Sequence, residues 1–263
     1  MPATTVYVSR LFVYPVKSLD PVDCDRVTIL ESGALQGDRT WAIYDRDGKF
    51  VNGKNNSKIH GLRSKFDLAT NTLTLQIQGT EQTVKFSLIA DQAALCRWLE
   101  SYFGFPVELR QNLTMGFPDD TVSPGATIVS TATLEAIASW YPELDTADIR
   151  RRFRANIELA VVPAFWEDRL FTTPDSTVKF KIGGVEFHGV NPCQRCIVVT
   201  RDPHTGEPYP KFQKIFVTQR QNTLPEKVER SRFNHYFRLA VNTKLAPTEA
   251  GKTIKIGDIL ELL

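Results

Sequence analysis

The 263-residue sequence has few cysteines, no long apolar run and little net charge. Four cysteines are too few for a disulfide framework, and the N-terminus lacks the charged and apolar segments of an export signal, so reduced thiols and a cytoplasmic location are expected. No apolar run approaches the roughly 18 residues of a membrane-spanning helix, so no membrane span is expected. With 32 Lys and Arg against 30 Asp and Glu, the net charge gives no reason to expect nucleic acid as a partner, and any anion site must be local.

The first part of the chain predicts a β-rich structure. Short β-branched and aromatic runs separated by Gly, Asn and Asp turns favour a barrel or sandwich over alternating strands and helices. One amphipathic helix is predicted over 91–103, with Asp91 placed to cap its start. The predicted strands span 6–16, 26–30, 41–45, 72–78 and 84–88.

The second part opens after a segment rich in turn formers, residues 116–125, where we place a domain boundary. A helix is predicted over 131–141, and strands over 127–129, 156–162, 178–190 and 196–200. Residues 253–263 alternate around a Gly-Asp turn and would close a barrel. The predicted fold is mainly β with a few helices (α+β): a β-barrel-like N-terminal domain over residues 1–115 and a second β-barrel domain over 116–263.

One motif is set aside. Gly48–Asn55 approaches the phosphate-binding G-x-x-x-x-G-K-[ST] loop but lacks the final Ser or Thr, and 41–52 is better explained as a hairpin around an Asp-Gly turn.

The C-x-x-C pair Cys193-Gln-Arg-Cys196 is more informative about function. Four interpretations of this pair compete. A redox disulfide would need a helix after the cysteines, whereas a strand is predicted, and a zinc site could also recruit His188 and His204. A soft-metal cofactor could bind one thiolate beside a cation, and two buried inert thiols also fit the spacing.

A longer resemblance decides among these possibilities. The segment Asn191–Gly206, Asn-Pro-Cys-Gln-Arg-Cys-Ile-Val-Val-Thr-Arg-Asp-Pro-His-Thr-Gly, resembles the signature of the MOSC family, a fold shared with the C-terminal domain of molybdenum cofactor sulfurases. In the amidoxime-reducing members of that family the second cysteine ligates molybdenum. The resemblance therefore implies that Cys196 is the metal ligand and catalytic residue, with Arg195 beside the metal and its pterin.

Other segments resemble the same family in the same order, over nearly the whole chain. They are Tyr14-Pro-Val-Lys-Ser18, Gly37-Asp-Arg39 with Trp41, Phe153-Arg-Ala-Asn-Ile157 and the acidic-aromatic patch Trp166-Glu-Asp168. A departure occurs at Val51–Asn55, where the family usually has a T-A-R-Q-like segment, so an expected Arg is replaced by Lys54 or lost.

The resemblance implies the molybdenum cofactor, whose phosphate, pterin ring and dithiolene need cations, short polar side chains and one soft ligand. Singly, each residue concerned could be a solvated surface residue; together they form a predicted site. The cofactor-binding residues predicted besides Cys196 are Lys17, Ser18, Arg39, Thr131, Arg154, Asn156 and Arg195.

The implied function is a molybdenum-dependent oxidoreductase that reduces small N-hydroxylated or other N-oxygenated substrates. The chain ends at Leu263 without the C-x4-C-x2-C spacing of a plant-type iron-sulfur cluster or a G-x-G-x-x-G dinucleotide loop, so electrons should come from a separate reductase or an iron-sulfur or haem carrier. Two alternatives stay open: a protein for sulfuration, storage or delivery of the cofactor, and a zinc-stabilised interaction module.

Overall fold

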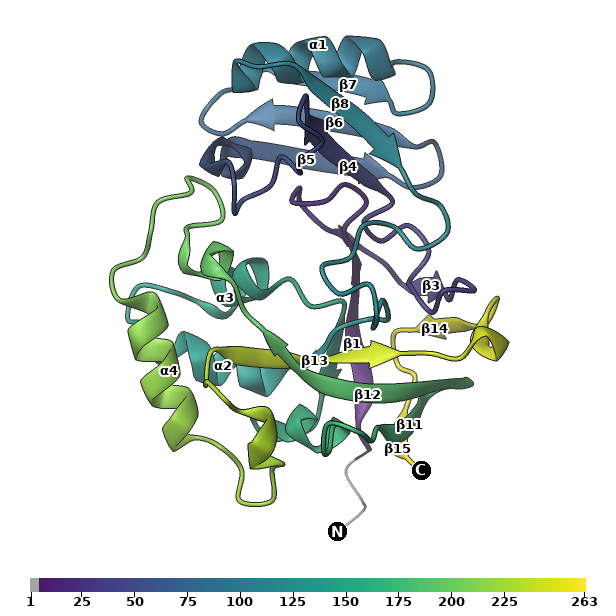
Figure 1. The fold of residues 1–263 in the computed structure, drawn as a ribbon, viewed down its shortest axis with the longest axis vertical. Helices are drawn as coiled ribbons and strands as arrows, with labels where there is room; N and C mark the ends of the chain where they lie inside the picture. Colours follow the sequence, from purple (N-terminus) through teal and green to yellow (C-terminus); the bar gives the residue numbers. More distant parts are fainter. Residues whose placement is uncertain (1–4) are drawn as a thin grey trace.

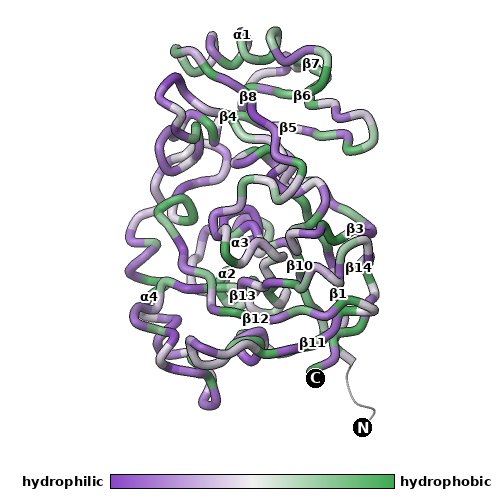
Figure 2. Tube along the Cα trace, turned by 45° about the vertical axis from the view of Figure 1, so that its right-hand side comes forward, coloured by the Kyte–Doolittle hydropathy of each residue, from purple (hydrophilic) through white to green (hydrophobic). Residues whose placement is uncertain are grey.

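The computed structural model describes residues 5–263, which form a smaller and a larger lobe (Figure 1). Fifteen strands and four α-helices lie within these residues, so the chain is mainly β, as predicted. None of the helices described is long and apolar enough to cross a membrane. In Figure 2 the trace alternates between hydrophobic and hydrophilic residues along α1 (Gln92–Phe103) and several strands, as expected for elements with one buried face.

The smaller lobe contains two antiparallel sheets and one helix. Leu95, Leu99 and Phe103 of α1 are buried with the apolar side chains of these strands. Asp91 precedes α1 but does not cap it, since its carboxylate instead accepts a hydrogen bond from the Ser87 backbone N–H at 2.8 Å. The elements are β4 (Trp41–Asp45) paired with β8 (Val107–Gln111), β5 (Leu62–Asp67), β6 (Thr72–Ile77) and β7 (Thr83–Ser87) in a second sheet, and α1 (Gln92–Phe103).

The larger lobe is built on an eight-stranded sheet in the order β15-β11-β12-β13-β9-β10-β1-β2. Its pairings are antiparallel except for the parallel pair β9 and β10. The strands are β1 (Tyr7–Val13), β2 (Val22–Asp23), β9 (Ile128–Ser130), β10 (Ile157–Ala160), β11 (Val178–Ile182), β12 (Val185–Gln194), β13 (Arg238–Lys244) and β15 (Leu260–Leu262).

The last segment of the chain returns to the first strand. The Leu260 N–H donates to Val6 at 2.9 Å and the Val8 N–H to Asp258 at 2.9 Å, so the segment before β15 meets the edge of β1. The turn predicted within 253–263 separates two strands that do not pair with each other: β14 (Thr253–Lys255) pairs with β3 (Arg26–Thr28), and β15 pairs with β11. The division at residue 115 stays a prediction; β1, from before it, pairs with β10 from after it.

The predicted strand over 196–200 is also wrong. β12 ends at Gln194, opposite Arg238, and the chain then forms the short 3-10 helix η3 (Ile197–Thr200). The Thr200 hydroxyl donates to the Ile197 carbonyl at 2.7 Å. The turn buries Val199 in a core while Ile197 stays exposed, so packing outweighs the strand preference of the β-branched run.

Three helices complete the larger lobe, of which the sequence predicted only α2 (Thr131–Ala138). α3 (Thr146–Phe153) begins with a reciprocal capping box, in which the side chains of Asp145 and Asp148 each accept from the other residue's backbone. α4 (Phe212–Asn222) lies in a stretch that we assigned no structure. Phe153, Phe212 and Phe216 from these helices share one aromatic core.

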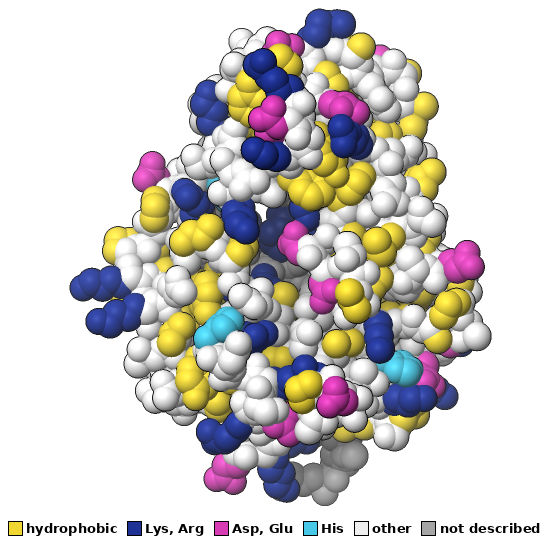
Figure 3. Space-filling model, in the orientation of Figure 1, with side chains coloured by type: hydrophobic (Ala, Val, Ile, Leu, Met, Phe, Trp, Pro, Cys, Tyr) yellow, Lys and Arg dark blue, Asp and Glu magenta, His cyan; other side chains and the backbone are white. Residues whose placement is uncertain are grey.

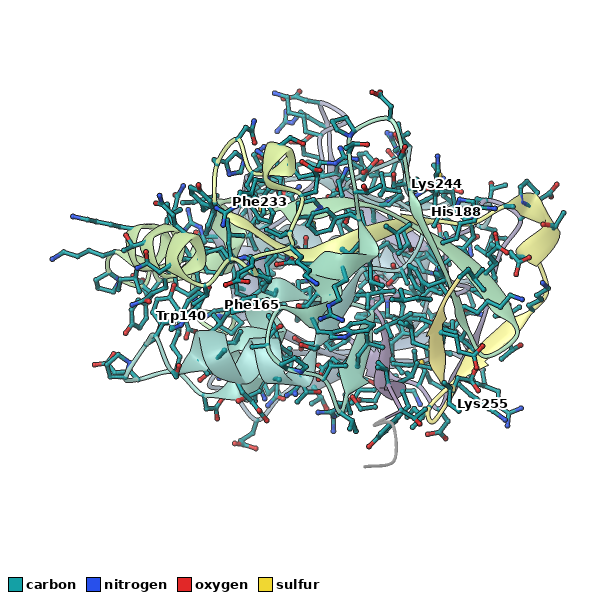
Figure 4. The ribbon with its side chains drawn as sticks, turned by 90° about the horizontal axis from the view of Figure 1, so that it is seen from below. Trp140, Phe165, His188, Phe233, Lys244 and Lys255 are labelled. Carbon is teal, nitrogen blue, oxygen red and sulfur yellow. The ribbon has the colours of Figure 1, made fainter. Side chains whose placement is uncertain are left out.

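A buried polar cluster lies beneath this core, at the acidic-aromatic patch of the sequence. Asp168 pairs with Arg220 at 2.5 Å, and the guanidinium of Arg220 lies 4.4 and 5.2 Å from the ring centroids of Phe165 and Phe233, both labelled in Figure 4. The neighbouring Glu167 accepts from the Thr133 hydroxyl at 3.0 Å, and its other oxygen has no hydrogen-bond partner within residues 5–263. Burial, with the nearby charge of Asp168, raises the pKa of Glu167 to about 7.

Glu167 should therefore make the folded state less stable as the pH rises. The unfolded chain loses this proton near pH 4.5 and the folded chain near 7, so Glu167 should lower the free energy of unfolding by on the order of 3 kcal/mol across that window. Glu167→Gln should remove this fall, so its stability relative to the wild type should increase between pH 4.5 and 7. Urea denaturation at several pH values measures the difference. The exposed Glu135→Gln is the control; wild-type and Glu167→Gln curves that stay parallel would contradict the assignment.

Candidate functional site

Most of the predicted site residues lie on loops where the two lobes meet. Figure 3 shows a hollow between the lobes with Lys and Arg side chains inside it and an acidic side chain at its rim. Lys17 links both lobes, since its backbone N–H donates to Trp41 of β4 at 2.8 Å while it follows β1 of the large sheet.

Two arginines lie over the buried ring of Tyr14. The guanidinium carbon of Arg154 is 4.0 Å and that of Arg39 is 5.2 Å from the ring centroid. Burial raises the pKa of Tyr14 to about 12, so its ring stays neutral. Arg154 also donates to the Leu19 carbonyl at 2.8 Å, and burial, with the nearby charge of Arg39, lowers its pKa. Burial acts to lower the pKa of Arg39 too, but nearby anionic groups, first its ion-pair partner Asp38 and then Asp119, together raise it.

Lys17 is 7% exposed and has few partners. Its ammonium donates to the Phe117 carbonyl at 2.9 Å and to Asp119 at 2.5 Å, and lies 5.1 Å from the ring centroid of Phe50. Burial lowers its pKa although Asp119 favours the charged form, and the charges of Arg39 and Arg154 lower it further. Lys17 is thus a desolvated cation close to two others.

The two cysteines of the C-x-x-C segment differ in their surroundings. Arg195 donates to the sulfur of Cys193 at 3.1 Å and also to the Phe153 carbonyl. Cys196 is exposed, and its sulfur has no hydrogen-bond or ion-pair partner within residues 5–263. Cys196 is therefore the thiol that is free to take an external ligand.

Three of the predicted residues have left-handed backbone conformations. Ser18, Arg39 and Arg154 have φ values of 73°, 49° and 53°. L-residues with side chains adopt this region at a cost of about 1 to 2 kcal/mol each, and such strain is concentrated at functional sites. Arg154 does so as the residue that ends α3.

Unpartnered donors at the site fit an external anion. The Nε of Arg195 is buried without an acceptor in the part of the chain that the structure describes. In the same residues the Ser18 hydroxyl has no hydrogen-bond partner either. A phosphate or pterin carbonyl offers the acceptors that these groups lack. The donor set therefore fits the molybdenum cofactor that the sequence implied.

Two predicted residues point elsewhere. The Asn156 amide accepts from the Thr127 N–H at 3.1 Å and donates to the Phe12 carbonyl at 3.1 Å, so it joins strands of the large sheet. The Thr131 hydroxyl is 3.4 Å from both Ser9 and Glu158. The role of these two residues in cofactor binding stays a prediction, and their contacts give it no support.

The histidines of the possible zinc site do not gather around the cysteines. His188 pairs with Glu186 at 3.2 Å and lies beside Lys244 in the sheet (Figure 4). His204 contacts Arg63 at 3.1 Å. Across residues 5–263 no group of three or more His, Cys, Asp or Glu side chains is placed to hold a metal ion.

The sequence analysis missed three contributors. Tyr14 and Asp38 lay inside the quoted family segments, yet we gave them no role. Asp119 lay in the turn-rich segment 116–125, which we used only as a boundary. The signal for Asp119 would have been a pair of carboxylates in a loop facing a basic site, but sequence spacing does not place that loop.

Comparisons with known proteins agree with the geometry. The MOSC N-terminal beta barrel domain matches residues 5–103, and the MOSC domain matches residues 124–261. The chain is 25% identical over 245 residues to the molybdenum cofactor sulfurase of Danio rerio and 23% identical over 248 residues to that of Homo sapiens. It is 26% identical over 242 residues to mitochondrial amidoxime reducing component 2 of Bos taurus.

Each alignment covers 76% of this chain, but the chain spans only 28% and 27% of the two sulfurases and 67% of the bovine protein. The relatives therefore connect this chain with molybdenum cofactor biology. Together the two domain matches account for most of the sequence, and the chain belongs to the family of MOSC-domain proteins.

Proposed function

We propose that this protein binds the molybdenum cofactor and acts as an oxidoreductase on N-oxygenated substrates. The observation that carries the proposal is an exposed thiol, Cys196, without a partner among residues 5–263. It follows Arg195, whose charge acts on the Asp119 carboxylate that binds the buried Lys17. Thiolate is a soft ligand suited to molybdenum, and the cations suit a phosphate. The bovine relative is named an amidoxime reducing component, and amidoximes are N-hydroxylated compounds, which supports the substrate class.

In this proposal the chain holds and orients the cofactor, which supplies the oxygen-transfer chemistry. Cys196 would ligate the metal. Lys17, Arg39 and Arg154 would neutralise the cofactor's anionic groups, while Arg195 would offer its unpartnered Nε and stay bound to Phe153 and Cys193. The Ser18 hydroxyl would add a short polar contact.

A second candidate is sulfuration, storage or delivery of the cofactor. The sulfurase relatives align over the same share of this chain as the amidoxime reducing component and at similar identity. Under this alternative Cys193 or Cys196 would carry a persulfide. A load of sulfane sulfur without catalytic turnover would favour delivery, whereas sustained turnover would favour the oxidoreductase.

Cys196→Ser should abolish molybdenum retention, because a hydroxyl is a harder and far less acidic ligand than a thiol. Cys193→Ser should have a milder effect, since Cys193 already interacts with Arg195. Metal analysis of both variants from a host that makes the cofactor measures this. Equal losses in the two variants would point to a site that uses both sulfurs and would contradict the assignment.

Lys17→Met and Arg154→Met should lower cofactor content while the fold persists. Each removes a charge-assisted contact of about 1.5 to 3 kcal/mol and keeps most of the side-chain volume. Cofactor content and melting temperature are measured together, with Arg110→Met as the control, since Arg110 forms an exposed pair with Glu108. Full cofactor content in both variants would show that the cradle is assigned to the wrong residues.

Turnover should require a separate electron donor. The sequence has neither a dinucleotide loop nor the cysteine spacing of a plant-type iron-sulfur cluster, so NADH or NADPH alone should not support reduction of an N-hydroxylated substrate. Reduced viologen, or a reductase and carrier pair, should support it. The assay compares these donors with the purified protein. Turnover with the nicotinamide alone would contradict the prediction, and no turnover with any donor would favour the delivery role.

A further inference from the structure

The site between the lobes presents hydrogen-bond donors almost everywhere. Lys and Arg side chains donate but cannot accept, and they make up most of its charged groups. The Asp38 carboxylate cannot serve as a free acceptor, because one oxygen binds Arg39 and the other accepts from the Tyr14 N–H at 2.8 Å. Of the two carboxylates that pair with these cations in the described part of the chain, Asp119 is therefore the one that remains to receive a donor from a ligand.

Asp119 is placed to do so. One of its oxygens accepts from Lys17 at 2.5 Å, and the charges of Arg39 and Arg195 also attract it. Its side chain is 88% exposed, and its second oxygen has no hydrogen-bond partner within residues 5–263. Lys17 thus fixes the carboxylate at one oxygen and leaves the other open beside the cations.

The cofactor contains groups of both kinds. Its phosphate and dithiolene sulfurs are anionic acceptors, which match the cations. Its pterin ring has a 2-amino-4-oxo edge, where a ring N–H and an amino group lie side by side as donors. One open carboxylate oxygen suits such an edge, because it carries two lone pairs and accepts hydrogen bonds without offering a donor.

We propose that Asp119 recognises the amino edge of the pterin ring and so makes the site selective for 2-amino-4-oxo pteridines. This inference rests on the proposed cofactor-binding function and adds the residue that reads the ring. A negative charge in a site of cations weakens the binding of a phosphate. Recognition of the pterin ring would explain why an exposed carboxylate lies there.

The test compares two small ligands that differ at this edge. Full-length protein made without the cofactor is titrated with 6-hydroxymethylpterin and with the matching lumazine, which has a carbonyl in place of the amino group. The wild type should bind the pterin about tenfold or more tightly, the worth of one charge-assisted hydrogen bond. Asp119→Asn should lose this preference, because an amide offers one acceptor and one donor, and Asp119→Glu should restore part of it.

Asp120→Asn is the matched control. Asp120 is the next residue, and its carboxylate accepts from the Val122 and Ser123 N–H groups, both at 3.0 Å, within its own loop. This variant should keep the preference for the pterin. Melting temperatures of all variants show whether the fold persists, and inorganic phosphate is titrated as a third ligand.

Two results would overturn the inference. Asp119→Asn could keep the wild-type preference for the pterin, or it could bind phosphate and both pteridines more tightly without changing their ratio. The second result would mean that the carboxylate occupies an anion position. The molybdenum content of wild-type protein from a cofactor-competent host distinguishes failure of this inference from failure of the proposed function. If the protein retains molybdenum but its pterin preference does not depend on Asp119, only this inference is contradicted. If it holds no molybdenum and binds no pteridine, the proposed function is contradicted as well.

Discussion

Repulsion among desolvated cations is the constraint on which the site depends. After burial, the charges of Arg39 and Arg154 lower the pKa of Lys17, and the charge of Arg39 lowers the pKa of Arg154. Each of the three cations is held by a different partner. Arg39 has the Asp38 carboxylate, and Lys17 has Asp119 and a carbonyl. Among residues 5–263, Arg154 contacts only a carbonyl and the face of a neutral tyrosine. Arg154 is therefore the least compensated of the three, and an incoming anion gains most from its charge.

The left-handed backbone conformations of Arg39 and Arg154 add a second free-energy cost at the site. A helix commonly ends in a left-handed residue, and glycine adopts that conformation most cheaply. α3 ends instead at Arg154, which keeps a long side chain over Tyr14. Arg39 is held in its conformation by the hydrogen bond from its N–H to the Tyr14 carbonyl at 2.7 Å. Tyr14 thus organises both arginines, one through its ring and backbone and the other through its ring.

Local pattern was sufficient for the elements that bury one regular face. β4, although buried on both faces, was predicted with the bounds it has because a short apolar run is followed by an Asp-Gly turn, and α1 because its apolar residues recur at helical spacing. Local sequence pattern failed to predict structure and contacts where packing against segments distant in the sequence determines them. The run 197–200 forms η3 because burial of Val199 in the core outweighs the strand preference of its β-branched residues. Asn156, grouped with the site by its family segment, is used by Phe12 and Thr127, which lie far away in the sequence.

The segment that departs from the family pattern shows how the smaller lobe reaches the thiol loop. Lys54, which stands in this segment where the family usually has an arginine, is exposed. A side chain at Gly53 has no room, because a Cβ there would lie 2.6 Å from His60 and 3.3 Å from Val198, two residues after Cys196. Burial lowers the pKa of His60, which favours a neutral ring. A neutral imidazole therefore lies against Gly53 on this side of the site.

The cation that acts here comes from β5 instead. Arg63 pairs with Asp20 at 2.9 Å and donates to the Pro203 carbonyl at 3.1 Å, so it ties the loop after Lys17 to the loop after Cys196. The His204 ring beside it has a pKa lowered by burial and by the charge of Arg63. Because Asp20 neutralises Arg63, these contacts join the loop after Lys17 to the loop after Cys196 without adding net charge to the site. The placement of Cys196 relative to Lys17 thus depends on a smaller lobe that supplies neither residue.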